Sequence, residues 1–231
     1  MLVVVIVIIV IAGIWAIKTG TLEISITFNM PFNKGTYSSG NENSVIAVVN
    51  GEEIYKPEYK DRLTRATQQY KFQGVNIFGL DTIQLIKNEV ISGLIKDKLL
   101  LQYAKKSNIA ISDDKIMEIY NKDIEAYGGE NNLINALDSL FLSQEEYKEI
   151  VRDQLTIDEY LRQSVDLSSV FVTEEEIQAG YNQAAQGVEN APLLEQARES
   201  IKQQLIQIKN QNIINEYLNG LLKESKIDLL L

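Results

Sequence analysis

A tight turn between two short extended segments is the feature that most constrains the fold. Residues 45–49 and residues 53–55 flank the dipeptide Asn50-Gly51. Asn-Gly between two such segments is the strongest short-range signal for a β-hairpin, because both residues tolerate the positive φ that the turn requires. An isolated two-stranded hairpin is only marginally stable. The sequence therefore predicts a small sheet that another part of the chain completes, and the candidate third strand is residues 227–231.

Most of the chain between these strands has helical patterning. Pro57 suits the first position of a helix, where its missing N–H has no partner to lose, and this helix is expected to reach about Gln73. A longer helix begins at Asp81, and its apolar residues recur at spacings of three and four, which is typical of an amphipathic helix. These residues are Ile83, Ile86, Val90, Leu94 and Ile95.

Capping residues mark the later helices. Ser112 is expected to cap a helix that ends at Gly128-Gly129, where glycine can adopt the left-handed closing conformation. A short helix follows, with apolar residues Leu133, Ile134, Leu137 and Leu140. Capping boxes, in which a hydroxyl and a glutamate three residues later satisfy each other's backbone N–H groups, are predicted at Ser143 with Glu146 and at Thr173 with Glu176. A last helix over about residues 193–223 is long for a globular protein and suits an arm or spine.

The N-terminal residues 2–17 form an uninterrupted apolar run that ends at Lys18. Crossing a bilayer as a helix takes about 20 apolar residues, with a lower limit near 17. We expect residues 1–18 to be a single-pass transmembrane anchor. A cleaved signal sequence is the alternative, although no basic residue precedes the run and no clear small-residue cleavage site follows it. Lys18 alone would favour a cytoplasmic body, but one lysine is a weak topology signal.

Residues 19–44 are expected to be an extended, flexible tether. Residues 21–28 alternate apolar and polar side chains, as a short edge strand or an extended spacer would. Residues 29–43 are rich in Asn, Gly and Ser, which is typical of a linker.

Composition excludes several classes of function. The chain contains no histidine and no cysteine, so it lacks the usual neutral-pH general base, thiolate ligands and a cysteine nucleophile. Its net charge of −10 argues against nucleic acid as a partner. The acidic groups Asp113-Asp114 and residues 174–176 lie in predicted first helical turns, where they stabilise the helix dipole. We therefore predict no catalytic residues, no metal site and no cofactor.

The order of these segments resembles the N-terminal domain of SurA- and PrsA-type extracytoplasmic folding chaperones. The resemblance is carried by SVIAVVNGEEIYKPEYKDRL at residues 44–63, ISGLIKDKLLLQYAKKSNIAISDDKI at residues 91–116, and the capped helices that begin SQEEYKEIVRDQL and VTEEEIQAGY. It covers residues 45–231 and implies a mainly α fold: a multi-helix cradle with a small β-hairpin joined by a C-terminal strand, a long C-terminal helix and the N-terminal transmembrane helix.

In that family a parvulin-type prolyl isomerase domain follows a segment like VTEEEIQAGYNQ. Here a short connector at residues 184–192, AAQGVENAP, stands in that place. About ten residues make a loop and not a domain. Parvulin sites are also built around histidines, so the resemblance implies the chaperone part without isomerase activity.

The resemblance implies an ATP-independent holdase, anchored in the cell membrane with its body on the extracytoplasmic side, that binds unfolded or newly exported polypeptides through exposed apolar surface. The aromatic candidates for client contact are Tyr59, Tyr70, Phe72, Phe78, Tyr120, Tyr127 and Tyr147. The alternative is an envelope scaffold or assembly protein that docks one folded partner through the long C-terminal helix.

Overall fold

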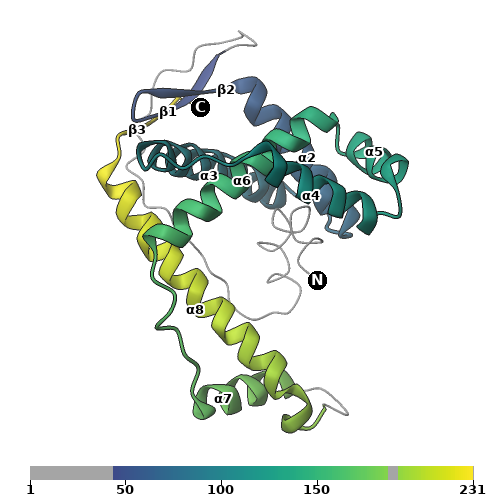
Figure 1. Ribbon diagram of the computed structural model, residues 1–231, viewed down its shortest axis with the longest axis vertical. Coiled ribbons are helices and arrows are strands. Elements are labelled where there is room, and N and C mark those ends of the chain that lie inside the picture. Colours follow the sequence, from purple (N-terminus) through teal and green to yellow (C-terminus); the bar gives the residue numbers. More distant parts are fainter. Residues whose placement is uncertain (1–43, 187–191, 231) are drawn as a thin grey trace. The chain divides into compact units, whose positions relative to one another are not determined.

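The computed structural model describes residues 44–186 and 192–230. The described chain forms two compact units (Figure 1). The first consists of the described residues up to Tyr160 together with those from Ser225 onward, and the second is Leu161–Glu224. The predicted anchor at residues 1–18, and nearly all of the predicted tether at residues 19–44, lie outside the described residues.

A three-stranded antiparallel sheet belongs to the first unit. Strands β1 (Val45–Val49) and β2 (Glu52–Tyr55) form the hairpin, and β3 (Ile227–Leu229) pairs with the other edge of β1, giving the order β2-β1-β3. Asn50 and Gly51 both have positive φ, at 51° and 89°. The predicted hairpin and its C-terminal third strand are therefore confirmed. β1 is the central strand, because β2 pairs with one of its edges and β3 with the other (Figure 1).

The described residues contain seven helices, which makes the protein mainly helical as predicted. They are α2 (Lys56–Phe72), α3 (Leu80–Lys106), α4 (Asp113–Ala126), α5 (Glu130–Ser139), α6 (Gln144–Ser164), α7 (Glu174–Ala185) and α8 (Leu194–Glu224). Within these described helices none is long and apolar enough to cross a membrane.

The predicted caps are present. The Ser112 hydroxyl accepts the Lys115 N–H at the start of α4. The Ser143 and Thr173 hydroxyls each accept a backbone N–H three residues later, and the glutamate at that position accepts the capping residue's own N–H. These reciprocal bonds satisfy groups that a helix end leaves unpaired, which is why short-range sequence patterns located these helix starts well.

The long helix α3 provides much of the core of the first unit. Ile86, Val90, Leu94 and Ile95 are buried, as their spacing predicts. Ile83 is 37% exposed, so its expected place on the buried stripe is wrong. Most residues in the first turn of α3 are exposed. Amphipathic spacing alone does not ensure that another helix or strand covers an apolar side chain.

A second apolar cluster joins α4, α5 and the N-terminal half of α6. Its buried members are Ile116, Tyr120, Leu133, Leu137, Leu142, Tyr147 and Val151. This cluster contains a carboxylate, Asp123, which is 1% exposed and accepts a hydrogen bond from the Tyr147 hydroxyl. Burial raises the pKa of Asp123, and the hydrogen bond from Tyr147 partly opposes that rise.

In the second unit α7 lies beside the N-terminal part of α8 (Figure 1). Gly180 allows the close approach, because a Cβ at this position would lie 3.1 Å from Cγ2 of Ile201. Ion pairs from Arg198 to Glu174 and from Lys209 to Glu176 connect the two helices. Helix α7 ends at Ala185 and α8 begins at Leu194, so residues 186–193 separate them and the first two residues of the expected connector at 184–192 belong to α7. Residues 187–191 are not described.

Candidate functional site

Exposed apolar side chains are concentrated where α2 passes into α3. Five of the twelve large hydrophobic side chains that are exposed in the described residues fall within residues 72–85. They are Phe72 (72% exposed), Phe78 (85%), Leu80 (85%), Ile83 (37%) and Leu85 (47%). Scattered exposed apolar residues are ordinary, but their concentration in one short segment makes this segment the candidate interaction surface. We call these five residues the α2–α3 surface.

Local backbone structure explains how this surface forms. Helix α2 ends at Phe72, and the chain turns through Gly74, whose φ is 74°. The N–H of Val75 then bonds the Tyr70 carbonyl, and the N–H of Phe78 bonds Oδ1 of Asn76. These bonds satisfy the polar backbone of the turn. Ile77 within the turn is buried, whereas Phe72, Phe78 and Leu80 remain at the surface.

Polar contacts hold the two helices together beneath this surface. The buried Tyr70 donates its hydroxyl hydrogen bond to Oε2 of Glu89 at 2.6 Å. Burial and the Glu89 carboxylate both raise the pKa of Tyr70, so its hydroxyl stays protonated and remains a donor at neutral pH. Arg62 on α2 forms an ion pair with Asp97 on α3. These contacts connect α2 and α3, the two helices that flank the α2–α3 surface.

The seven aromatic candidates divide into three groups. Phe72 and Phe78 are exposed and belong to the α2–α3 surface. Tyr59 and Tyr127 are half-buried. Tyr70, Tyr120 and Tyr147 are buried, with 2–3% of their surface exposed, and are unavailable to a partner in this conformation.

The buried tyrosines have structural partners. The Tyr120 hydroxyl bonds Oε1 of Gln144 at 2.6 Å, and its ring packs 6.3 Å from the ring of Tyr147. Sequence reasoning concentrated on aromatic residues and so missed Leu80 and Leu85. The available signal for Leu80 was its position directly after Gly79, where α3 begins. Leu85 lies six residues after Gly79, within α3, and no local signal distinguished it.

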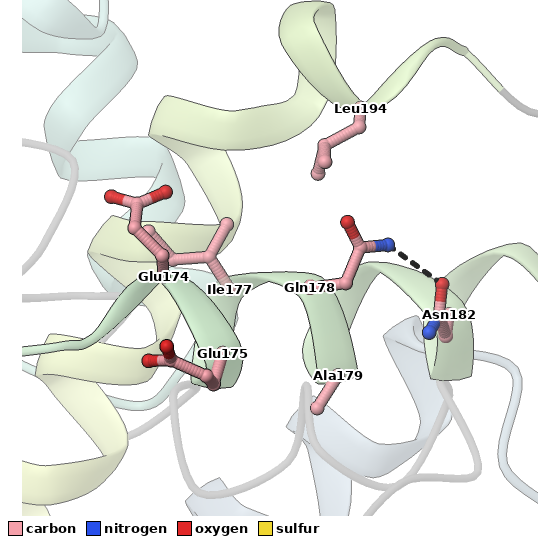
Figure 2. A pocket seen from close by; sticks show the side chains of 7 residues that line it. All are labelled: Glu174, Glu175, Ile177, Gln178, Ala179, Asn182 and Leu194. Carbon is pink, nitrogen blue, oxygen red and sulfur yellow. Dashed lines mark hydrogen bonds between the residues drawn. The ribbon is translucent and has the colours of Figure 1, made fainter.

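A shallow, open hollow of about 500 Å³ lies in the second unit, between α7 and the start of α8 (Figure 2). Ile177, Ala179 and Leu194 give it apolar character, and Gln178 bonds Oδ1 of Asn182 along its side (Figure 2). Its volume falls in the range of small-molecule sites, but such sites enclose most of their ligand. This open hollow suits contact with a larger partner better than capture of a small molecule.

The acidic clusters have structural roles. Asp113 forms an ion pair with Arg152 at 2.9 Å, and Glu176 both caps α7 and pairs with Lys209 at 2.7 Å. The Lys209 ammonium and the Thr173 N–H hold the pKa of Glu176 below its usual range. Across residues 44–186 and 192–230, no group of three or more acidic side chains is arranged to hold a metal ion.

Taken as a class, the described residues form a mainly helical domain with exposed apolar side chains at residues 72–85, and its sheet is completed by a C-terminal strand. The chain belongs to the SurA-like N-terminal domain family, whose sequence model matches residues 2–136. This finding agrees with the resemblance seen in the sequence.

Two relatives are each about a quarter identical to this chain over the aligned residues. It is 28% identical over 153 residues to the foldase protein PrsA of Caldanaerobacter subterraneus subsp. tengcongensis, covering 63% of this chain and 44% of that protein. It is 27% identical over 138 residues to the chaperone SurA of Methylobacillus flagellatus, covering 58% of this chain and 30% of SurA. The chain thus spans less than half the length of either relative.

A solved structure from a study of two SurA-like chaperones of Campylobacter jejuni also matches. The TM-score is 0.47 at 13% identity, over 81% of this chain and 99% of that one.

Proposed function

We propose that this protein is a folding chaperone that holds unfolded or newly exported polypeptides at the α2–α3 surface. The observation that carries the proposal is that Phe72, Phe78 and Leu80 are all exposed where α2 passes into α3. Membership of the SurA-like family, and relatives named as a foldase and a chaperone, support the same function.

Binding at such a surface is weak and reversible. Complete burial of one Leu or Phe side chain contributes about 1.5–3 kcal/mol, and an open surface buries each only in part. Association costs at least about 4 kcal/mol in lost freedom of motion, so a few partial contacts leave only a modest net affinity. No ATP-binding motif is present in the sequence, and release would follow from this low affinity.

The proposed activity does not include prolyl isomerisation. The whole sequence contains no histidine, and α7 and α8 are joined by residues 186–193 where the family carries its isomerase domain. The chain would therefore supply binding alone.

We further propose that residues 2–17 anchor the protein in the cell membrane with its body on the extracytoplasmic side. Tethering would raise the effective concentration of the α2–α3 surface near emerging chains. Membrane fractionation of cells expressing the full chain, followed by protease treatment of intact spheroplasts, tests both points. Recovery of the protein in the soluble fraction, or protection of its body from protease, would contradict this topology.

The test of chaperone function follows light scattering by a chemically unfolded, aggregation-prone client, with and without residues 44–231 of this protein. Circular dichroism first establishes that this portion is folded. Suppression of scattering without nucleotide supports a holdase. Absence of suppression, with one stoichiometric partner recovered by affinity capture from envelope extracts, would instead favour the scaffold alternative.

A further inference from the structure

A second hollow, of about 380 Å³, lies in the first unit between α2 and the start of α6. Asp61, Thr64 and Arg65 line it from α2, Glu146 lines it from α6, and Phe141 lines it from the turn that precedes α6. Phe141 is 63% exposed and has a φ of 57°, so the turn presents its ring at the surface. The hollow thus combines an aromatic side chain with one guanidinium and two carboxylates.

Arg65 differs from Arg62 and Arg152 in making no ion pair among the described residues. Arg62 pairs with Asp97, and Arg152 pairs with Asp113. For Arg65, no hydrogen bond or ion pair forms within residues 44–186 and 192–230. Partial burial lowers the pKa of Arg65, an effect that the nearby Asp61 carboxylate partly opposes. A partly desolvated guanidinium whose N–H groups bond no described residue gains strongly from an oxygen acceptor.

The hollow also offers an acceptor. Oε2 of Glu146 is engaged by the N–H and the hydroxyl of Ser143, at 2.8 and 2.7 Å. Asp61 accepts no hydrogen bond from the described residues and is exposed. Two carboxylates beside one guanidinium disfavour an anionic ligand. They suit a neutral ligand that carries both a donor and an acceptor, which is the chemistry of a peptide backbone.

The spacing along α2 connects this hollow with the α2–α3 surface. Arg65 and Phe72 are seven residues apart, so they lie on the same face of the helix, about 10 Å apart along its axis. An extended chain covers that distance in about three residues. A polypeptide lying along α2 could therefore contact Phe72 at one end while its backbone reaches Arg65, in the hollow that Phe141 also lines.

We propose that Arg65 and Asp61 bind the backbone C=O and N–H groups of an extended client segment whose side chains contact Phe72 and Phe141. This inference rests on the proposed chaperone function and adds how a client is recognised. Backbone groups are common to all sequences, so contact with them would allow many clients to bind without a sequence motif.

The test measures binding of a fluorescein-labelled, end-blocked peptide of alternating phenylalanine and serine to the full chain in lipid nanodiscs, by fluorescence anisotropy. A second probe has the same side chains but ester groups in place of alternate backbone amides, which removes N–H donors and weakens C=O acceptors. The variants are Arg65→Met, Arg65→Lys and Asp61→Asn. The matched control is Lys60→Met, which removes one positive charge from α2 outside the hollow. Empty nanodiscs give the background.

We expect Arg65→Met to weaken binding of the amide peptide about tenfold, because it removes a hydrogen bond from a charged donor. Arg65→Lys keeps the charge but loses the planar fork, so an intermediate loss is expected. Lys60→Met should bind as the unmodified protein does. The ester probe should bind the unmodified protein several-fold more weakly than the amide peptide, and this difference should shrink in Arg65→Met and Asp61→Asn.

Equal binding of the amide and ester probes, together with unchanged affinity in the Arg65 and Asp61 variants, would overturn this inference while leaving the chaperone function in place. Failure of the unmodified protein to bind either probe would overturn both. A preference for a peptide with added glutamates would show a carboxylate site, and would also contradict backbone recognition.

Discussion

The side-chain amide of Asn50 donates a hydrogen bond to Oε1 of Gln102 at 3.1 Å, and the Gln102 amide in turn donates one to the Val49 carbonyl at 2.8 Å. Oδ1 of Asn50 also accepts the N–H of Lys226 at 2.9 Å. One turn residue therefore connects the hairpin, helix α3 and the segment that leads into β3. These contacts join parts of the first unit that are far apart in the sequence.

Replacing Asn50 with glycine isolates the contribution of these side-chain bonds, since glycine tolerates the φ of 51°. We expect Asn50→Gly to lower the free energy of unfolding by about 1–3 kcal/mol, because the buried Gln102 loses a partner. The measurement is urea unfolding. The matched control is Asn108→Gly, at a φ of 55°, which should be close to neutral. Equal effects of the two changes would contradict this role for Asn50.

Two tyrosine hydroxyls differ in how well their acceptors are buried. Tyr147→Phe should destabilise the protein by about 1–3 kcal/mol, because it leaves the carboxylate of Asp123 buried without that hydrogen bond. Tyr70→Phe makes the same chemical change beside Glu89, which is exposed and can bind water instead. We therefore expect Tyr70→Phe to cost less than Tyr147→Phe in urea unfolding. The reverse order would contradict the buried position of Asp123.

Asp123 should make the folded protein less stable as the pH rises, which is the opposite of the usual effect of a carboxylate that is paired in the folded state. Burial raises its pKa in the folded protein above the ordinary value of 3.8. The folded state then binds the proton more tightly than the unfolded state does. Its contribution to stability is therefore complete below pH 3.8 and is lost as the pH rises through the raised pKa.

This dependence is measured as the free energy of unfolding of the unmodified protein minus that of Asp123→Asn, followed with pH. The difference should fall as the pH rises and then level off. A difference that increases with pH would show that the folded-state pKa is lowered. Titration of the Asp123 carboxyl carbon by NMR checks the direction independently.

The α2–α3 surface should contribute to client binding and little to stability. We expect Phe78→Ser and Leu80→Ser, at side chains that are each 85% exposed, to weaken client binding about fivefold each, from loss of partial apolar burial. Stability should change by no more than about 0.5 kcal/mol. Phe171→Ser is the matched control, because Phe171 is 70% exposed but lies in the second unit. Full aggregation suppression by the Phe78 and Leu80 variants would contradict this assignment.

Local sequence patterns located most elements of the fold. These patterns act on nearby backbone. The Asn50-Gly51 dipeptide forms a turn, the hydroxyls of Ser112 and Thr173 bond N–H groups at helix starts, and Gly128 follows the end of a helix. Such effects depend on residues a few positions apart, so a single sequence is enough to read them. The resemblance to a known family added the pairing of the C-terminal strand, which the structure confirms.

The composition of the chain likewise shows that histidine and cysteine chemistry is absent from this sequence. The sequence alone did not determine which side chains remain exposed. Tyr147 and Phe78 were equivalent candidates, yet one is 3% exposed and the other 85%. Burial depends on which helix faces meet in three dimensions, and those contacts also buried Asp123 and brought Phe141 beside Arg65. Local patterns therefore set the helices and strands, and tertiary packing decided the surface that they present.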